Sequence, residues 1–415
     1  MFENTKSLPI TVEQVWAAYR EVRKHGKSAG VDELTLKGYE EVRSDELYKV
    51  WNRMASGSYF PPSVRRVEIP KADGKKRKLG IPTVSDRVAQ TVVKNYLEPL
   101  LEPHFQDYSF AYRPHKNAHD AVRQAAEQCR QKAWVLDLDI EGFFDNLDHD
   151  KLMQAVQKHT TEKWVLMYIE RWLKAPIEHR DGSLEYPTKG SPQGGVISPL
   201  LSNLYLHYTF DQWMSIYYGG IVFERYADDI VVHCSSKQEA EHLLEAIKTR
   251  MMQCGLRLHP EKTKIVYCKN SNRKDKYEEV SFDFLGFRFK PKKARNRQTG
   301  EIFTDFGPAS ISKKSLRKIL DTVKSKHLHR RVREELADLS GELAAHIRGW
   351  VNYFGKINKW FLYPVTAAIN DRLIMWATNR YKSLNGSSWQ GRQWLREIYR
   401  DYPNMFEHWK YGFKP

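Results

Sequence analysis

The stretch Tyr226-Ala227-Asp228-Asp229 stands between two apolar runs, Ile-Val-Phe at 221–223 and Ile-Val-Val at 230–232. Apolar runs on both sides of a short acidic segment predict a β-hairpin with carboxylates at its turn. Two neighbouring carboxylates repel each other, so we expect a positive charge beside them. A divalent metal bound for phosphoryl transfer would supply that charge, and an acidic turn on a surface hairpin is the plainer alternative.

A second acidic segment lies in the predicted strand 134–140, where Asp137 and Asp139 share one face because side chains alternate along a strand. Acids are poor strand formers and are costly inside a sheet unless they are paired or bound to metal. If folding brings one of them beside Asp228, the carboxylates could hold two Mg²⁺ ions about 3.5–4 Å apart. A solvent-exposed strand end would explain the same residues without a metal.

Two further segments have the chemistry to bind a phosphorylated ligand. Alternation over 64–69, a turn at 72–74 and a return over 75–79 predict a basic hairpin that carries Lys71 and Arg77 on opposite arms. Arginine binds phosphate through two parallel hydrogen bonds, and lysine acts as a point charge. The Gly-rich segment 190–195 precedes a predicted helix and would let a ligand approach its backbone closely. A solvated charge run and an ordinary turn are the competing interpretations of these two segments.

The composition describes a large basic protein. Its 415 residues exceed one ordinary core and predict two or three domains, and its net charge of +16 favours a nucleic-acid partner over a merely soluble basic protein. No apolar run is long enough to span a membrane, and residues 1–7 lack the apolar core of a signal peptide. The four cysteines are scattered, which argues against a disulfide framework and a zinc site. We therefore expect a soluble protein of the cytoplasm.

Local patterns also mark helix starts and a domain boundary. Thr11 with Gln14 and Ser236 with Glu239 have the spacing of capping boxes. Six basic residues without an acid among them fall between 288 and 297, and a helical, Trp-rich pattern follows from about 311. We expect a boundary near 290–310. Aromatic residues of this last segment are expected in its core rather than stacked on RNA bases, namely Trp350, Tyr353, Trp360, Trp376, Trp389 and Trp394.

Taken together and in order, these segments resemble the sequence blocks of bacterial group II intron reverse transcriptases and maturases. The resemblance covers nearly the whole chain, and a run of six or more ordered blocks is far more specific than any single one. The matching segments are 69–87, Ser109-Phe110-Ala111-Tyr112-Arg113-Pro114, 139–149, 190–201, 226–229, 255–256, 262–264, 284–287 and Arg348-Gly349-Trp350-Val351-Asn352-Tyr353-Phe354.

The resemblance implies an α+β right-hand polymerase fold, with fingers, a palm built on a small antiparallel sheet, and a helical thumb. It divides the chain into an N-terminal extension (1–62), fingers and palm (63–290) and a thumb with a maturase-specific region (291–415). Asp139 and Asp228 would bind metal together with the backbone carbonyl of Ile140, and Asp229 would be the third catalytic carboxylate. The dNTP site would comprise Lys71, Arg77, Phe144 as a steric gate against ribose, and Gln193; template, primer or RNA contacts would come from Arg113, Gly194, Lys262 and Arg348.

The implied activity is RNA-directed DNA polymerisation with two Mg²⁺ ions, or Mn²⁺ in their place. The expected partners are an RNA template, a DNA or RNA primer, dNTPs and a group II intron RNA that the protein helps to splice. Ala111 departs from the family's usual glycine, and without Cys pairs or a His-Asn-His pattern we expect the DNA endonuclease domain of some relatives to be absent. Two alternatives remain: a mainly RNA-binding splicing cofactor, and a free-standing group II-like reverse transcriptase used in defence or DNA repair.

Overall fold

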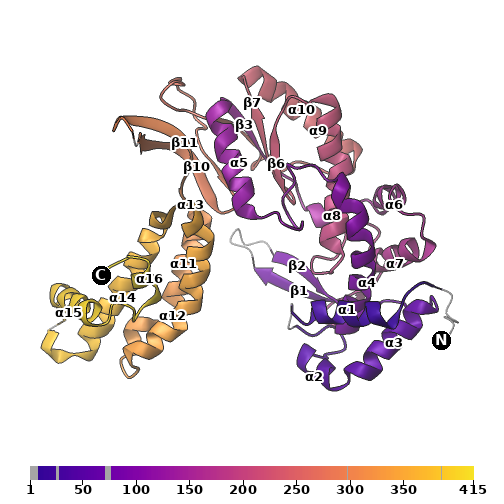
Figure 1. Ribbon diagram of the computed structural model, residues 1–415, viewed down its shortest axis with the longest axis horizontal. Helices are drawn as coiled ribbons and strands as arrows, with labels where there is room; N and C mark the ends of the chain where they lie inside the picture. Colours follow the sequence, from indigo (N-terminus) through magenta and orange to yellow (C-terminus); the bar gives the residue numbers. More distant parts are fainter. Residues whose placement is uncertain (1–7, 25–27, 71–75, 297, 385) are drawn as a thin grey trace. The chain divides into compact units, whose positions relative to one another are not determined.

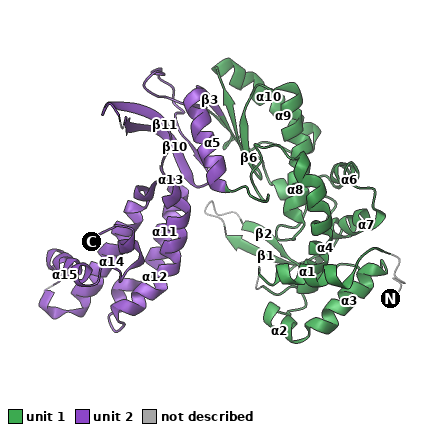
Figure 2. Cartoon of the chain, viewed as in Figure 1, with its two compact units in different colours: residues 1–117, 136–265 green, residues 118–135, 266–415 purple. Residues whose placement is uncertain are grey.

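The computed structural model describes residues 8–24, 28–70, 76–296, 298–384 and 386–415. The chain forms two compact units (Figure 2). The first unit contains 1–117 and 136–265, and the second contains 118–135 and 266–415. The predicted division into 1–62, 63–290 and 291–415 stays a prediction, and the compact units differ from it by placing 118–135 with the C-terminal part of the chain.

The first unit begins with helices that pack on one another (Figure 1). Thr11 and Gln14 form the predicted capping box at the start of the first helix, and the Ser236 hydroxyl caps α10 (Lys237–Gln253) by accepting from Glu239 N. The other helices of this unit are α1 (Val12–Val22), α2 (Leu36–Glu41), α3 (Arg43–Ala55), α4 (Val84–Leu101), α6 (His149–Gln157), α7 (Lys163–Leu173), α8 (Ser198–Leu206) and α9 (Gln212–Tyr217).

A small sheet in the first unit contains the predicted basic hairpin. Its order is β2-β1-β4-β5, where β1 (Val64–Pro70) pairs antiparallel with β2 (Lys76–Ile81) and parallel with β4 (Ile177–Glu178). The last strand is β5 (Leu184–Glu185). Residues 71–75, which connect β1 and β2, lie outside the described residues, and so does the predicted role of Lys71.

The central sheet has the order β6-β7-β3-β8 and carries the acidic segments. Its strands are β6 (Phe223–Tyr226), β7 (Asp229–Cys234), β3 (Trp134–Asp139) and β8 (Lys264–Tyr267). The predicted hairpin is present, but its turn is shifted by one residue: Tyr226 pairs with Asp229, so Ala227 and Asp228 form the turn and Asp229 begins β7. Ala227 takes a left-handed conformation with φ 55°, which such hairpin turns require. β3 is hydrogen-bonded beside β7, and the charge of Asp139 at the end of β3 acts on Asp228, so the acidic end of β3 lies near this turn.

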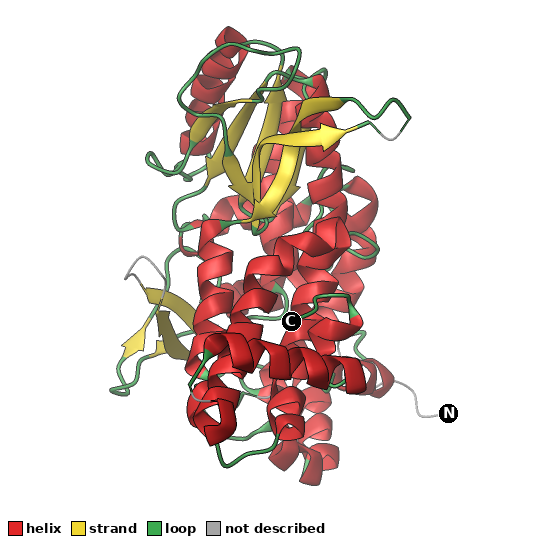
Figure 3. Cartoon of the chain, turned by 90° about the vertical axis from the view of Figure 1, so that its left-hand side faces the viewer, coloured by secondary structure: helices red, strands yellow, loops and turns green. Residues whose placement is uncertain are grey.

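The second unit combines a three-stranded sheet with helices (Figures 1 and 3). The sheet has the order β11-β10-β9, with β9 (Phe282–Phe284), β10 (Phe287–Arg295) and β11 (Ile302–Ile311), and helix α5 (Ala118–Gln131) packs on β11. The C-terminal helices are α11 (Lys313–Ser325), α12 (Leu336–Trp350), α13 (Lys356–Asn358), α14 (Tyr363–Arg380), α15 (Ser388–Asp401) and α16 (Glu407–Lys410). This mixture of helices and small sheets confirms the predicted α+β class.

The prediction that the C-terminal aromatic residues are core holds for Trp376, which is fully buried and donates from Nε1 to Arg331 O at 3.0 Å. It is wrong for Trp360 and Trp389, whose exposed fractions are 56% and 70%. Helical spacing of tryptophans does not say which face of a helix meets a neighbour, and α15 buries only Gly391 and Leu395.

Within the described ranges, the helices lack the length and apolar character that crossing a bilayer demands.

Candidate nucleotidyl-transfer site

Asp139 and Asp228, the two acids that the sequence singles out, come together where β3 ends and β7 begins, and these are the two inner strands of the central sheet. Asp139 ends β3 with its side chain 33% exposed, and its Oδ2 accepts a hydrogen bond from Lys262 Nζ at 3.1 Å. Burial raises the pKa of Asp228, and the negative charge of Asp139 raises it further, while Arg77 and Lys262 act in the opposite direction. The two carboxylates are therefore close enough to repel each other, and the two cations lie within their electrostatic reach.

The oxygen atoms at this end of the two inner strands suit a hard divalent cation. Asp229 follows Asp228 at the exposed start of β7, and the backbone of Ile140 bridges Leu258 directly after Asp139. Among the described residues, no three His, Cys, Asp or Glu side chains converge as a complete metal site would. A pair of carboxylates with a nearby carbonyl still fits Mg²⁺, because this ion keeps waters and takes substrate phosphates as ligands.

The basic hairpin and the Gly-rich segment meet through their backbones. Gly80 N donates to Gln193 O at 2.9 Å, and Arg77 Nε donates to the Gln193 side chain, Oε1, at 2.9 Å. Gly194 has φ +129°, and a Cβ atom there would lie 2.4 Å from Gly80 O. Only glycine permits this approach. The contact places two predicted dNTP ligands, Arg77 and Gln193, side by side.

The other end of the Gly-rich segment binds the turn that carries Phe144. Ser191 N donates to Phe144 O and Gly190 N donates to Leu147 O, both at 2.7 Å. His149 Nε2 lies 2.7 Å from Gly190 O. Phe144 itself is 9% exposed, directly after the acidic end of β3. One short loop therefore fixes the predicted steric gate relative to Gln193 and Arg77.

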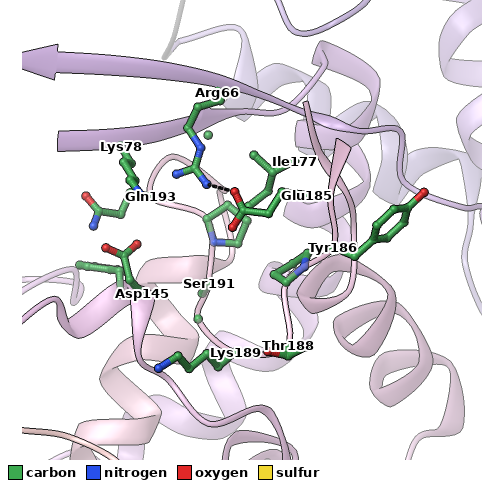
Figure 4. Close-up of a pocket in the computed structure, with 15 residues that line it drawn as sticks. Arg66, Lys78, Asp145, Ile177, Glu185, Tyr186, Thr188, Lys189, Ser191 and Gln193 are labelled. Carbon is green, nitrogen blue, oxygen red and sulfur yellow. Dashed lines mark hydrogen bonds and ion pairs between the residues drawn. The ribbon is translucent and has the colours of Figure 1, made fainter. Parts of the chain in front are cut away.

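Phe144 and Gln193 line a cavity of about 270 Å³ (Figure 4). Its wall also contains three cations, of which Arg66 pairs with Glu185 at 3.3 Å and Lys189 donates to Asn146 Oδ1 at 2.9 Å. The third cation is Lys78. In Figure 4, Tyr186 points its ring away from the other labelled side chains. The cavity combines an aromatic face, an amide and three cations against the two acids Asp145 and Glu185, and this net positive wall suits a nucleotide.

A buried polar pair supports the Gly-rich segment from behind. Gln90 Oε1 accepts from Val196 N at 2.7 Å and from Ile197 N at 3.3 Å, and its Nε2 donates to Asp86 Oδ2 at 2.9 Å. Asp86 also accepts from Tyr59 and Trp172. Burial raises the pKa of Asp86 to about 6, although these hydrogen bonds favour its charged form. No sequence pattern indicated a functional role for this pair.

Tyr112 is a site residue that sequence reasoning missed. It has φ 55° and is half exposed. Burial raises the pKa of its hydroxyl, and the charge of Asp228 raises it further, while Arg77 lowers it. The phenol therefore lies among the predicted catalytic groups. Its position in the run 109–114 was the only available signal.

The remaining predicted site residues have different surroundings. The Arg113 side chain is 5% exposed and donates to Glu102, Gln106 O and Ser109 O, so it holds a loop together. Arg348, in the second unit, is half exposed and lies 3.4 Å from Glu407 Oε2 through Nη1. Nucleic-acid contacts of both residues stay predictions.

The fold and this arrangement of acids, cations and a Gly-rich loop form a candidate nucleotidyl-transfer site, and comparison with known proteins shows the family of the chain. The chain belongs to the reverse transcriptase (RNA-dependent DNA polymerase) family, whose model matches residues 69–289. A group II intron maturase-specific domain matches residues 316–395. The resemblance to group II intron reverse transcriptases and maturases is thereby confirmed, and divalent metal ions are general to this family.

Three relatives show the range of this similarity. The chain is 31% identical to protein YkfC of Escherichia coli over 310 residues, which cover 66% of this chain and 78% of that protein. It is 34% identical to the group II intron-encoded protein LtrA of Lactococcus lactis over 196 residues, covering 46% of this chain and 32% of LtrA. It is 32% identical to the mitochondrial nuclear intron maturase 1 of Arabidopsis thaliana over 93 residues, or 22% and 13% of the two chains.

Proposed function

We propose that this protein copies RNA into DNA at the site formed by Asp139 and Asp228, and that it binds a group II intron RNA whose splicing it assists. The observation that carries the polymerase is that Asp139, Arg77 and Lys262 all lie within electrostatic reach of Asp228, with Lys262 Nζ 3.1 Å from Asp139 Oδ2. The maturase-specific match at 316–395 and the similarity to LtrA support the intron RNA. An RNA template, a DNA or RNA primer and dNTPs are the corresponding substrates.

The reaction would join a primer to one nucleotide at a time. The primer 3′-hydroxyl attacks the α-phosphorus of a dNTP; a new P–O bond forms, the bond to pyrophosphate breaks, and the hydroxyl proton passes to solvent water. Two Mg²⁺ ions, or Mn²⁺, held by Asp139, Asp228 and the Ile140 carbonyl would lower the charge on the attacking and leaving oxygens when bound. Positioning and charge neutralisation are the main contributions of the protein in such reactions.

The cations of the site would act on the triphosphate and on the acids. Arg77 has a planar guanidinium for phosphate oxygens, and its bond to Gln193 aims it. Lys262 balances Asp139 through their 3.1 Å contact, so an entering cation competes with Lys262 for the same carboxylate. The ring of Phe144 would crowd a ribose 2′-hydroxyl and so favour deoxynucleotides.

Primer extension on an RNA template tests the polymerase. Asp228→Asn keeps the shape of the side chain but removes its charge, so extension should be abolished while RNA binding stays nearly intact. Asp150→Asn replaces an exposed acid of α6 and should leave extension unchanged. An Asp228→Asn protein as active as the unmodified one would rule out this site.

Splicing of the candidate intron RNA by the same variant tests the second activity. If RNA binding and polymerisation use separate surfaces, Asp228→Asn should splice normally. Failure of the unmodified protein to bind or splice any group II intron RNA would favour a free-standing reverse transcriptase.

A further inference from the structure

The strand that leads into the Ala227–Asp228 turn carries a buried ion pair. Arg225, at the end of β6, is fully buried, and its guanidinium binds Asp211 through Nε–Oδ1 at 2.7 Å and Nη2–Oδ2 at 2.5 Å. Asp211 is equally buried and ends a π-helical turn, His207–Asp211, between α8 and α9. Burying two charges is costly unless their geometry and remaining hydrogen bonds are good. The remaining donor of Arg225 therefore matters.

That donor reaches two acceptors. Arg225 Nη1 donates to Ala227 O at 3.3 Å and to Asn203 Oδ1 at 3.0 Å. Asn203 is a buried residue of α8, and its Nδ2 donates in turn to Ala111 O at 2.7 Å. Ala227 is the left-handed residue before Asp228, and Ala111 precedes the left-handed Tyr112.

The backbone of Arg225 is also hydrogen-bonded to the loop that carries Ala111 and Tyr112. Arg225 N donates to Tyr108 O at 2.8 Å, and Phe110 N donates to Arg225 O at 2.9 Å. A residue other than glycine in a left-handed conformation costs roughly 1–3 kcal/mol and persists only where its surroundings hold it. The strained Ala227 and the residues just before the strained Tyr112 are thus joined to one centre by hydrogen bonds.

We propose that Arg225, Asp211 and Asn203 form a positioning triad that holds Asp228 and Tyr112 in fixed relation to each other. The triad touches no substrate; it acts through the carbonyl groups of Ala227 and Ala111. This inference rests on the proposed function only where it concerns catalysis by Asp228. The structural part, that the triad fixes both left-handed residues, stands independently.

The same hairpin supplies a matched control. Glu224 and His233 are also buried, and His233 Nε2 lies 2.6 Å from Glu224 Oε2. Glu224 neighbours Arg225 on the strand and therefore faces the other side of the sheet. Its second oxygen, Oε1, has no hydrogen-bond partner within the described structure. Disturbing this pair should cost stability without loosening the turn.

Amide hydrogen exchange of the whole protein tests the structural part. Arg225→Met should speed exchange in peptides covering 226–229 and 108–112 roughly tenfold, as expected for one lost charge-assisted hydrogen bond. Arg225→Lys keeps the charge but not the planar fork, so it should loosen the same peptides with a smaller loss of melting temperature. Glu224→Gln should lower the melting temperature and leave both peptides unchanged.

A double variant separates positioning from packing. Replacing a buried ion pair by apolar residues often restores stability, so Arg225→Met with Asp211→Leu should recover much of the melting temperature lost by Arg225→Met alone. Exchange at the turn should remain fast, because Ala227 O and Asn203 still lack their donor. Recovery of slow exchange together with the melting temperature would overturn the triad.

Binding of Mn²⁺ to the unliganded protein, measured by electron paramagnetic resonance, tests the consequence for the acids. The single and double Arg225 variants should bind Mn²⁺ roughly tenfold more weakly, and Glu224→Gln should bind it normally. Unchanged Mn²⁺ affinity in both Arg225 variants would refute the proposed effect on Asp228. A protein that shows these exchange changes but never extends a primer would refute the proposed function and leave the triad intact.

Discussion

The predicted functional groups of the two units are held in different ways. In the first unit, Arg77, Phe144 and Gln193 are fixed by hydrogen bonds and by a backbone approach that only Gly194 allows. In the second unit, Arg348 stands half exposed on α12 with one ion pair of 3.4 Å to Glu407. The first arrangement is rigid and geometric, whereas the second is electrostatic and screened by salt. Substitutions should therefore have sharp effects in the first unit and graded effects in the second.

Among the substitutions that test this contrast, the largest effect is expected from Gly194→Ala. Its Cβ would lie 2.4 Å from Gly80 O, so the Gly-rich loop and β2 must separate, and Gln193 moves away from Arg77. A displacement of this kind costs about 100-fold in kcat for primer extension.

Gly182→Ala is the matched control, because Gly182 has φ +82° but meets nothing within 4 Å. It carries the backbone strain without the clash and should retain most activity. Equal losses for the two variants would show that strain alone matters and would remove the geometric argument.

Phe144→Ala should give the next largest effect. Without the ring, the ratio of ribonucleotide to deoxynucleotide incorporation is expected to rise roughly 10- to 100-fold, as for other changes of pocket size. Single-nucleotide incorporation with dNTPs and rNTPs measures this ratio. Phe143→Ala removes the neighbouring buried ring and should reduce stability while leaving sugar selectivity unchanged. If Phe144→Ala discriminates as well as the unmodified protein, the steric gate lies elsewhere.

Asp86→Asn should change the pH dependence of stability. The folded-state pKa of Asp86 is raised to about 6 from 3.8, so its contribution to stability is largest below about pH 4 and decreases as pH rises to about 6. The difference in unfolding free energy between the unmodified protein and the variant should thus shrink with rising pH, by about 3 kcal/mol at most.

Thermal or denaturant unfolding between pH 4.5 and pH 7 measures that difference. Asp107→Asn changes a side chain that is 93% exposed and should give a difference that hardly varies over the same range. If the difference in unfolding free energy between the unmodified protein and Asp86→Asn grows with pH, the raised pKa of Asp86 is contradicted.

The smallest effect is expected from Arg348→Gln in the second unit. Loss of one phosphate contact should weaken RNA binding severalfold and lower the slope of log affinity against log salt by about 1. Glu407→Gln removes the ion-pair partner but keeps the cation, so it should bind RNA at least as tightly. An unchanged salt slope in Arg348→Gln would show that Arg348 is structural and would sharpen the contrast between the units.

Much of the first unit's site could be predicted from the sequence because the sequence signals are local. Alternation and an acidic tip predicted the β6–β7 turn, and two capping boxes predicted helix starts at Thr11 and Ser236. Resemblance to a family then linked Asp139 with Asp228 across 89 positions, which no local pattern could do. The sequence failed where burial decides the outcome, as for the exposed Trp360 and Trp389.

The amino-acid sequence by itself determined the chemical groups, the strand and turn that carry the acids, and the family of the protein. Only the tertiary structure revealed that Tyr112 lies near Asp228, that Gln90 holds the Gly-rich loop, and that Arg225 donates to Ala227 O and is linked through Asn203 to Ala111. The physical reason is range. Propensity and periodicity act over a few residues, whereas a buried hydrogen bond joins groups that meet only after distant segments have packed.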